Sequence, residues 1–407
     1  MSICLTVLGA CSGAANSNSP DGAPPGPAGE ASTVGPDGST ASPPVPAAPS
    51  AAASSVAASS MAASSVAASS VAASSVAASS VAASSMAASS AAASSLPDST
   101  DIGARVDAVD ERRLMAHVER LAASPRDNTD SGRAAQAAAD YSAQQLRNYG
   151  VEVNTIPVQA EGIELPVVWT EIGGQRCPGT ATYVLVGHYD TVPGSPGADD
   201  NASGTAAVLE TARVLAKAGL PISVTLAVLP FEEPGPPFRG ALALLSALQT
   251  GETGRRVLGA VSAEMVGFSS PELVDGERQD VLYLLGYQGA ETLVTTFAAA
   301  SDRWGAGNVV ARTVPADNPF IWRSDHAAFH DAGIPAAMAT DGGETRNPNY
   351  HKDSDRPDTL SPAFLAEATR TFVGGLAALS ARSAPPSAPS TGRSPAATNS
   401  PCQGPTG

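Results

Sequence analysis

Segments with helical and strand patterns alternate along the chain from residue 110 onward. Helical spacing of apolar residues is found at 110–122, 132–148, 202–218, 240–249, 291–301, 324–330 and 362–381. Short apolar, β-branched or alternating runs, which are typical of strands, lie at 151–158, 165–172, 183–187, 224–230, 257–265, 281–285 and 336–339. Strands that alternate with helices predict an α/β fold with a mixed, mostly parallel central sheet flanked by helices.

Both ends of the chain lack this pattern. Residues 51–95 repeat a five-residue unit such as Ser-Ser-Val-Ala-Ala, and this period matches neither a helix nor a strand. Pro, Gly, Ala and Ser dominate residues 12–100 and 383–407, so both segments are expected to be disordered, with transient helix where alanine is dense. One globular domain is therefore predicted over residues 101–382, between a long low-complexity linker and a short tail.

The first eleven residues, MSICLTVLGAC, end in Leu8-Gly9-Ala10-Cys11, which resembles the lipobox of bacterial lipoproteins. The resemblance implies that residues 1–11 are a truncated signal, and that the protein is exported and either anchored to the membrane through an acylated Cys11 or secreted. The alternative is a chance cysteine, because the segment is short for a signal peptide and has no basic residues before it. Only Cys177 lies inside the predicted domain, so no disulfide framework is expected.

The charge of the chain excludes one class of partner. The formal net charge is -16, whereas binding to nucleic acid phosphates needs a basic surface. We therefore expect no nucleic acid partner. No apolar run approaches the length of roughly 20 residues that a membrane-spanning helix needs.

Candidate chemistry gathers where predicted strands end. His188, the pair Glu232-Glu233, and Glu264 all lie at or just beyond a strand end, and ligands of α/β sheets bind at the carboxyl ends of strands. A histidine after a buried strand is more often structural than catalytic. Asp190 strengthens the functional interpretation, because its carboxylate could accept the second imidazole N–H, as happens beside metal ligands.

Two further acidic segments allow both a structural and a functional interpretation. Residues 197–204, GADDNASG, fit a turn that leads into a capped helix, but capping needs one polar side chain and this loop has two carboxylates and an amide. Glu232 and Glu233 could belong to a solvated loop. Alternatively, because adjacent side chains at a strand end point in different directions, one of them could bind a metal while the other faces a bound water.

Five segments taken together resemble peptidase family M28, whose members are zinc metallopeptidases of the aminopeptidase-like exopeptidase type. They are GHYDTVPGSPGADDNASG, LPFEEP, AEMVGF, RSDHAAFHDAGIPA and RNPNYHKDSDRPDTL, in the order of the family, over residues 182–360. The implied fold is that of the zinc exopeptidases, which is also described as phosphorylase/hydrolase-like.

The resemblance also implies roles for individual residues. One zinc ion would be held by His188, Asp200 and Glu264, and a second by Glu233, His351 and the same bridging Asp200. Glu232 would be the general base, Asp190 would support His188, Asp325 and His326 would support the site, and the bond between Asp200 and Asn201 would be cis. Two features depart from the family: Glu264 replaces an aspartate common there, and the loop FEEPGPPFRGA is longer and richer in proline.

The implied activity is that of a monomeric aminopeptidase with two zinc ions, which hydrolyses the N-terminal bond of a peptide or aminoacyl substrate by activating water. A dipeptidase or an N-acyl amide hydrolase stays open. Two rivals share the fold: a single-zinc glutaminyl-cyclase-like acyltransferase, which lacks the first-zinc histidine, and a non-catalytic cell-surface module, which is expected to lose ligands. A serine relay within Ser324-Asp325-His326 is excluded, because three consecutive residues cannot form it.

Overall fold

A computed structural model describes residues 100–175, 180–250, 254–274, 277–304, 308–315, 318 and 322–382. The predictions for the lipobox, the low-complexity linker, the C-terminal tail and Cys177 fall outside these residues. Among the helices described, none has the length and apolar character to cross a membrane.

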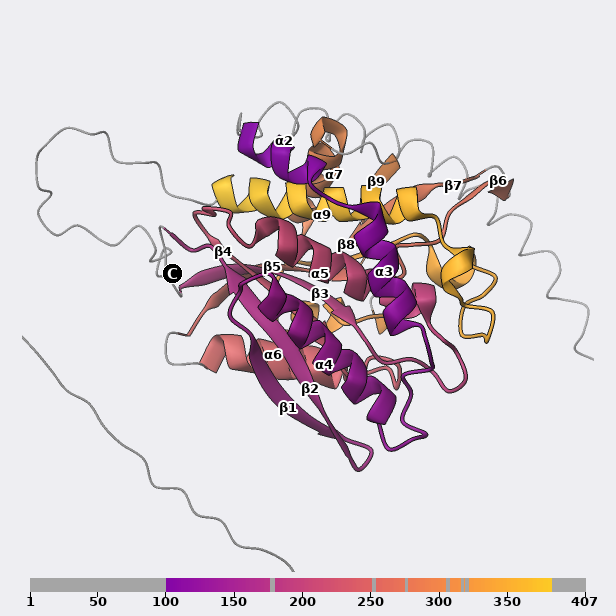
Figure 1. Cartoon of the computed structure of the whole chain (residues 1–407). Helices are drawn as coiled ribbons and strands as arrows, with labels where there is room; N and C mark the ends of the chain where they lie inside the picture. Colours follow the sequence, from indigo (N-terminus) through magenta and orange to yellow (C-terminus); the bar gives the residue numbers. More distant parts are fainter. Residues whose placement is uncertain are drawn as a thin grey trace, which may run out of the picture. The chain divides into compact units, whose positions relative to one another are not determined.

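The central element is an eight-stranded mixed sheet with the strand order β1-β2-β4-β3-β5-β10-β8-β9 (Figure 1). The strands are β1 (Asn154–Ala160), β2 (Ile163–Ile172), β3 (Ala181–His188), β4 (Ser223–Leu229), β5 (Arg256–Ala263), β8 (Val281–Gly286), β9 (Asn308–Thr313) and β10 (Ala336–Thr340). Strands β4, β3, β5 and β10 run parallel, as do β8 and β9, while the pairs β1-β2, β2-β4 and β10-β8 are antiparallel. The predicted mixed, mostly parallel sheet is confirmed.

Helices cover the sheet. They are α2 (Thr100–Asp107), α3 (Glu111–Leu121), α4 (Arg133–Asn148), α5 (Gly204–Leu215), α6 (Arg239–Thr250), α7 (Glu291–Trp304), α8 (His326–Asp331) and α9 (Pro362–Arg382). The connection from β3 to β4 moves one way along the sheet and that from β4 to β5 moves back, so right-handed crossovers place α5 and α6 on opposite faces. Helix α9 packs with α2, α5 and α7, and α6 packs with α8.

The burial of the central strands explains their sequences. Every residue of β3 and β4 is buried, which matches the near-continuous apolar runs ATYVLVGH and SVTLAVL. Helix α3 begins where expected, because the Asp110 carboxylate caps it by accepting hydrogen bonds from the amides of Arg112 and Arg113.

The sequence pattern missed α2, β9 and a small antiparallel pair formed by β6 (Ser270–Val274) and β7 (Glu277–Gln279). Strand β9 is a short, half-exposed edge strand, so it carries little of the apolar signal that marks β3 and β4. The strand expected at 151–158 is shifted to β1, and the helix expected at 202–218 is the shorter α5.

Candidate metal centre

Three neighbouring strands deliver the acidic and histidine side chains to one edge of the sheet. Strand β3 ends at His188, Glu232 follows β4 by three residues, and Glu264 follows β5 directly. These strands are parallel, so their carboxyl ends meet at the same edge. Asp200 joins them from a π-helical turn, Ala198–Ser203, that leads into α5.

His188 lies at the centre of a cluster of carboxylates. Its Nε2 atom is 3.5 Å from Asp200 Oδ1, 3.4 Å from Glu264 Oε2 and 3.7 Å from Glu232 Oε2. All four side chains are buried. This group contains the three residues predicted for the first zinc ion, and their donor atoms lie within 4.8 Å of one another.

A second group shares Asp200. The Nε2 atom of His351 lies 3.2 Å from Asp200 Oδ2 and 3.2 Å from Glu233 Oε2. The two carboxylate oxygens of Asp200 therefore face two different imidazoles, one on each side. This is the arrangement that a carboxylate bridging two metal ions requires.

The donor set fits divalent metal ions. His188 Nε2, Asp200 Oδ2 and Glu233 Oε1 are buried and have no hydrogen-bond partner within the described part of the chain. Burial raises the pKa of Glu233 to about 8 and that of Glu232 well above its usual range, and neighbouring carboxylates add to both shifts. A cation among these acids would offset the free-energy cost of burying their negative charges. Mixed histidine and carboxylate ligation suits Zn²⁺.

The comparisons with known proteins agree with this geometry. Residues 168–374 match the profile of Peptidase family M28. This chain belongs to peptidase family M28. It is 28% identical over 298 residues to a "Probable zinc metalloprotease" of Pyrenophora tritici-repentis, covering 61% of this chain and 60% of that protein. It is 30% identical over 190 residues to "Aminopeptidase YwaD" of Bacillus subtilis, covering 45% of this chain and 38% of the relative. The chain thus spans about 60% of the length of the first of these relatives.

Solved structures share the fold. The Legionella pneumophila LapA aminopeptidase superposes with a TM-score of 0.59 at 20% identity, covering 70% of this chain and 76% of that one. A glutaminyl cyclase of Bacteroides thetaiotaomicron gives a TM-score of 0.53 at 18% identity, covering 66% of this chain and 98% of that one. Both likenesses establish the zinc-exopeptidase fold of this M28 chain.

His188 contacts Asp190 through the backbone carbonyl oxygen of Asp190, whereas the sequence predicted a hydrogen bond to its carboxylate. His188 Nδ1 is 3.2 Å from the backbone carbonyl oxygen of Asp190 and 3.7 Å from its Oδ1 atom. The carboxylate of Asp190 accepts hydrogen bonds from the amides of Glu232 (3.2 Å) and Glu233 (3.1 Å). Asp190 therefore links the ends of β3 and β4 and fixes the two acids that follow β4.

The residues that hold the loops of the candidate ligands in place were less visible in the sequence. The Asp355 carboxylate accepts hydrogen bonds from the amides of Asp199 (2.9 Å) and Asp200 (3.1 Å). The buried guanidinium of Arg126 donates to the carbonyls of Tyr189, Pro196 and Gly197. Asp355 lies in a segment that carries the family resemblance, whereas nothing around Arg126 in the sequence marks it.

The consecutive residues Ser324, Asp325 and His326 lie in two different environments. Ser324 Oγ donates to Glu264 Oε2 at 2.7 Å and so orients that acid. Asp325 is buried nearby, and burial raises its pKa to about 8. His326 stacks on Tyr287 and lies 3.2 Å from the Tyr287 hydroxyl, and burial lowers its pKa to about 3. Neither Asp325 nor His326 belongs to the groups of donors that converge in the described residues.

Backbone geometry around the centre is unusual. The peptide bond between Asp200 and Asn201 is cis, as the resemblance to the family implies. Phe231, Met265 and His351 have φ of 61°, 50° and 59°, a region that non-glycine residues rarely adopt. Phe231 directly precedes Glu232, and Met265 directly follows Glu264. Such conformations concentrate at functional sites.

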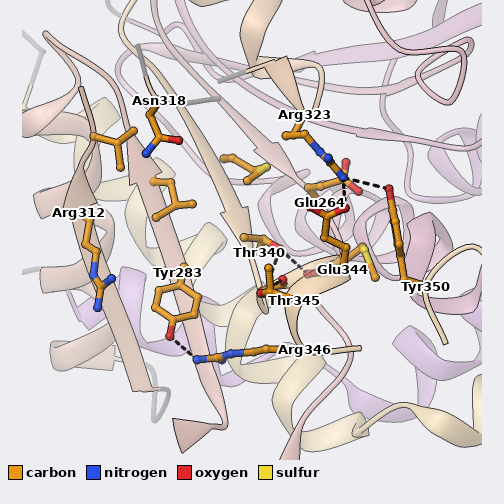
Figure 2. A pocket seen from close by; sticks show the side chains of 16 residues that line it. Glu264, Tyr283, Arg312, Asn318, Arg323, Thr340, Glu344, Thr345, Arg346 and Tyr350 are labelled. Atoms are coloured by element: carbon orange, nitrogen blue, oxygen red, sulfur yellow. Dashed lines mark hydrogen bonds and ion pairs between the residues drawn. The ribbon is translucent and has the colours of Figure 1, made fainter. Parts of the chain in front are cut away.

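A cavity of about 440 Å³ opens beside Glu264 (Figure 2). Its floor is formed by alternate residues of β8 and β10 together with Arg312 of β9, and its walls come from Arg323, residues 342–346 and Tyr350. Tyr350 also stacks on His351, at 3.7 Å between ring centroids. The cavity therefore adjoins both halves of the candidate centre.

Proposed function

We propose that this chain is a zinc-dependent exopeptidase, an aminopeptidase that hydrolyses N-terminal peptide bonds with two metal ions. The observation that carries the proposal is the position of the Asp200 carboxylate. Its Oδ1 atom lies 3.5 Å from His188 Nε2, and its Oδ2 atom lies 3.2 Å from His351 Nε2. The family membership and the aminopeptidase named among the relatives support it. In this proposal the substrate is a peptide or aminoacyl compound, and the protein acts as a monomer.

The residues that would hold the metals are those already described. His188, Asp200 and Glu264 would bind one Zn²⁺, and Asp200, Glu233 and His351 the other. Zinc at such a site supplies Lewis acidity for the scissile carbonyl and makes water acidic enough to lose a proton near neutral pH.

Glu232 would move the proton. Its carboxylate lies at the edge of the first group, 3.7 Å from His188 Nε2, and its backbone amide is held by Asp190. From this position Glu232 would accept a proton from the attacking water and return it to the leaving amine. Its buried setting, which raises its pKa, suits a group that must hold a proton between these two steps.

The two rivals on the same fold are less consistent with the geometry. A single-zinc acyltransferase has no use for two imidazoles on opposite sides of one carboxylate. A non-catalytic module would have no reason to keep all five donors and Glu232 together at one edge of the sheet.

The proposal is tested with a panel of aminoacyl-4-nitroanilides, each with a free or an acetylated α-amino group, and with the full-length protein loaded with zinc. We expect zinc-dependent hydrolysis of the free forms and none of the acetylated ones. Hydrolysis of the acetylated forms alone would point to an N-acyl amide hydrolase. Cyclisation of N-terminal glutamine without hydrolysis would point to the acyltransferase.

We also propose that the protein is exported and either anchored to a membrane by a lipid on Cys11 or secreted. The supporting observation is the lipobox-like sequence Leu8-Gly9-Ala10-Cys11. Metabolic labelling with a radioactive fatty acid tests it: the unsubstituted protein should incorporate label and the Cys11→Ala variant should not.

A further inference from the structure

The cavity beside Glu264 combines an apolar floor with arginine side chains. Met338 of β10 pairs with Leu285 of β8, which in turn pairs with Arg312 of β9, so these three residues form one row across the sheet. Thr340 and Tyr283 form the next row on the same face. Figure 2 shows Arg312 and Tyr283 side by side in this floor.

Two of the three arginines in the cavity have hydrogen-bond partners. Arg346 donates to the backbone carbonyls of Val281 and Asp341 and to the hydroxyl of Tyr283. Arg323 pairs with Glu344, with its Nη2 atom 2.5 Å from Oε2. The other acid that lines the cavity is Glu264, which belongs to the candidate metal centre.

Arg312 differs from both. Its guanidinium lies over the ring of Tyr283, at 5.4 Å from the ring centroid. Its Nε atom is buried without a hydrogen-bond partner, and no carboxylate pairs with it within the part of the chain that the structure describes. A cation–π contact of this kind uses none of the N–H donors of the guanidinium, which leaves them free for a planar acceptor. The arrangement is notable in a protein with a net charge of -16.

We propose that this cavity binds a carboxylate of the substrate and that Arg312 recognises it, an inference that rests on the proposed peptidase function. A carboxylate matches the guanidinium edge with two parallel hydrogen bonds. Leu285 and Met338 would contact the carbon atoms that precede this carboxylate, and the nearby charge of Arg346 would favour an anion.

The spacing along the sheet suits this role. Strands β5, β10, β8 and β9 are successive neighbours, and three strand spacings separate Arg312 from Ser262, its counterpart in the same row, by about 14 Å. Glu264 lies two residues further along, so the backbones of Glu264 and Arg312 are about 16 Å apart. An extended arginine side chain together with a substrate side chain can span that separation. The carboxylate could be the side chain of an N-terminal Glu or Asp, or the C-terminal carboxylate of a dipeptide.

The test compares substrate ratios in the zinc-loaded, full-length protein. Glutamyl- and leucyl-4-nitroanilide test the side chain, while Leu-Ala and Leu-Ala-amide test the terminal carboxylate. Arg312→Gln should lower kcat/KM about 10–100-fold for the substrates that carry the recognised carboxylate. Its effect on the matched uncharged substrate should stay below about threefold. A loss confined to glutamyl-nitroanilide identifies the side chain, and a loss confined to Leu-Ala identifies the terminus.

Two other variants separate recognition from folding. Arg312→Lys should retain part of the preference, and Arg312→Glu should shift it toward lysyl-4-nitroanilide. Arg112→Gln, which removes a side chain that is 95% exposed on α3, serves as the matched control and should change no ratio. An equal change in all four substrates with Arg312→Gln would overturn the inference.

A separate readout keeps this inference distinct from the proposed function. If the unsubstituted, zinc-loaded protein hydrolyses none of the substrates, the proposed function fails. Calorimetric titration with L-glutamate and L-leucine then tests the cavity alone. If the unsubstituted protein binds glutamate more tightly than leucine and Arg312→Gln does not, the inference is supported. If glutamate binds to both proteins with equal affinity, the inference is overturned.

Discussion

Two buried histidines of this protein have opposite surroundings. His117 of α3 has both ring nitrogens matched, with Nδ1 2.6 Å from the Tyr141 hydroxyl and Nε2 2.9 Å from the Tyr149 hydroxyl. Burial, assisted by Arg113 and Arg213, lowers its pKa to about 4, so it is neutral in the fold. It completes a hydrogen-bonded packing arrangement of α3 and α4.

His188 is buried more completely and has the opposite electrostatics. Burial alone would lower its pKa, but Glu232, Glu264, Asp190 and Asp200 raise it well above the usual value. Its Nε2 atom lacks a hydrogen-bond partner among the described residues. The contrast shows that burial of a histidine does not mark a site. An unmatched ring nitrogen that faces several carboxylates is the better sign of a site, because a bound metal ion would satisfy both the nitrogen and the carboxylates.

The largest expected effect is on catalysis. Glu232→Gln should keep both of the proposed metal ions and lower kcat by about 10²–10⁴-fold, because the proposed proton-transfer group is lost while the candidate ligands remain. Steady-state kinetics and metal analysis of the same preparation measure the two quantities.

Glu210→Gln is the matched control for Glu232→Gln, since Glu210 is also buried but is satisfied by the Asp110 amide and Arg213. It should lower the free energy of unfolding and leave kcat unchanged. Glu233→Gln should instead weaken binding at one metal site. If Glu232→Gln loses metal and Glu233→Gln loses only kcat, the two adjacent acids have been assigned in the wrong order.

A smaller effect is expected from a residue that orients a ligand. Ser324→Ala removes the hydroxyl that donates to Glu264, so the affinity for the first zinc ion should fall about 10–100-fold. Competition with a chromophoric chelator measures the affinity. Ser380→Ala removes a buried hydroxyl that bonds to the backbone of Ile222 and should leave metal affinity intact. Equal affinities in both variants would show that Ser324 does not orient Glu264.

His117 should affect the stability of the fold and not metal binding. The pKa of His117 is about 4 in the fold and about 6.5 in the unfolded chain, so the unfolded state binds more protons below pH 6.5. Its neutral form therefore contributes full stability above pH 6.5, and this contribution falls by about 2–3 kcal/mol as the pH drops toward 4.

Urea unfolding of the unsubstituted protein and of His117→Gln, at pH 7.5, 6 and 5, measures this effect. The difference in unfolding free energy between the two proteins should change with pH in favour of His117→Gln as the pH falls, since glutamine does not titrate. Parallel pH profiles would contradict the assignment of His117 as a neutral structural histidine.

The smallest effect is expected from removal of residues 1–99, because the donor groups that converge in the described part of the chain all come from residues 188–351. Activity and Tm should stay unchanged, and the proposed lipid anchor on Cys11 predicts that the protein is released from membranes. Nitroanilide hydrolysis, thermal unfolding and fractionation measure these properties. A loss of activity with the release would show that this segment contributes to the folded domain.

The sequence alone predicted the layered sheet and the positions of His188, Glu232 and Glu264, because buried strands have a strong apolar pattern and their ends are visible as the first polar residues. It could not predict that β10 inserts between β5 and β8, since strand order depends on long-range packing.

The supporting residues were hidden for a related reason. Arg126 acts through backbone carbonyls some 60–70 positions away, and hydrogen bonds to carbonyls leave no trace in the partner's residue type. Arg312 lies on β9, whose half-exposed edge gave no strand signal, so the arginine could not be placed beside the centre. The proposed roles of the candidate metal ligands came from the family resemblance and not from spacing.

The central claim is that Asp200 bridges two metal ions, and metal stoichiometry tests it most directly. Full-length protein dialysed against excess Zn²⁺ and then freed of unbound metal should contain two zinc ions per chain. His188→Ala and His351→Ala should each retain one, and Asp200→Ala should retain less than either. A single zinc ion in the unsubstituted protein, unaffected by one of the two histidine substitutions, would contradict the account.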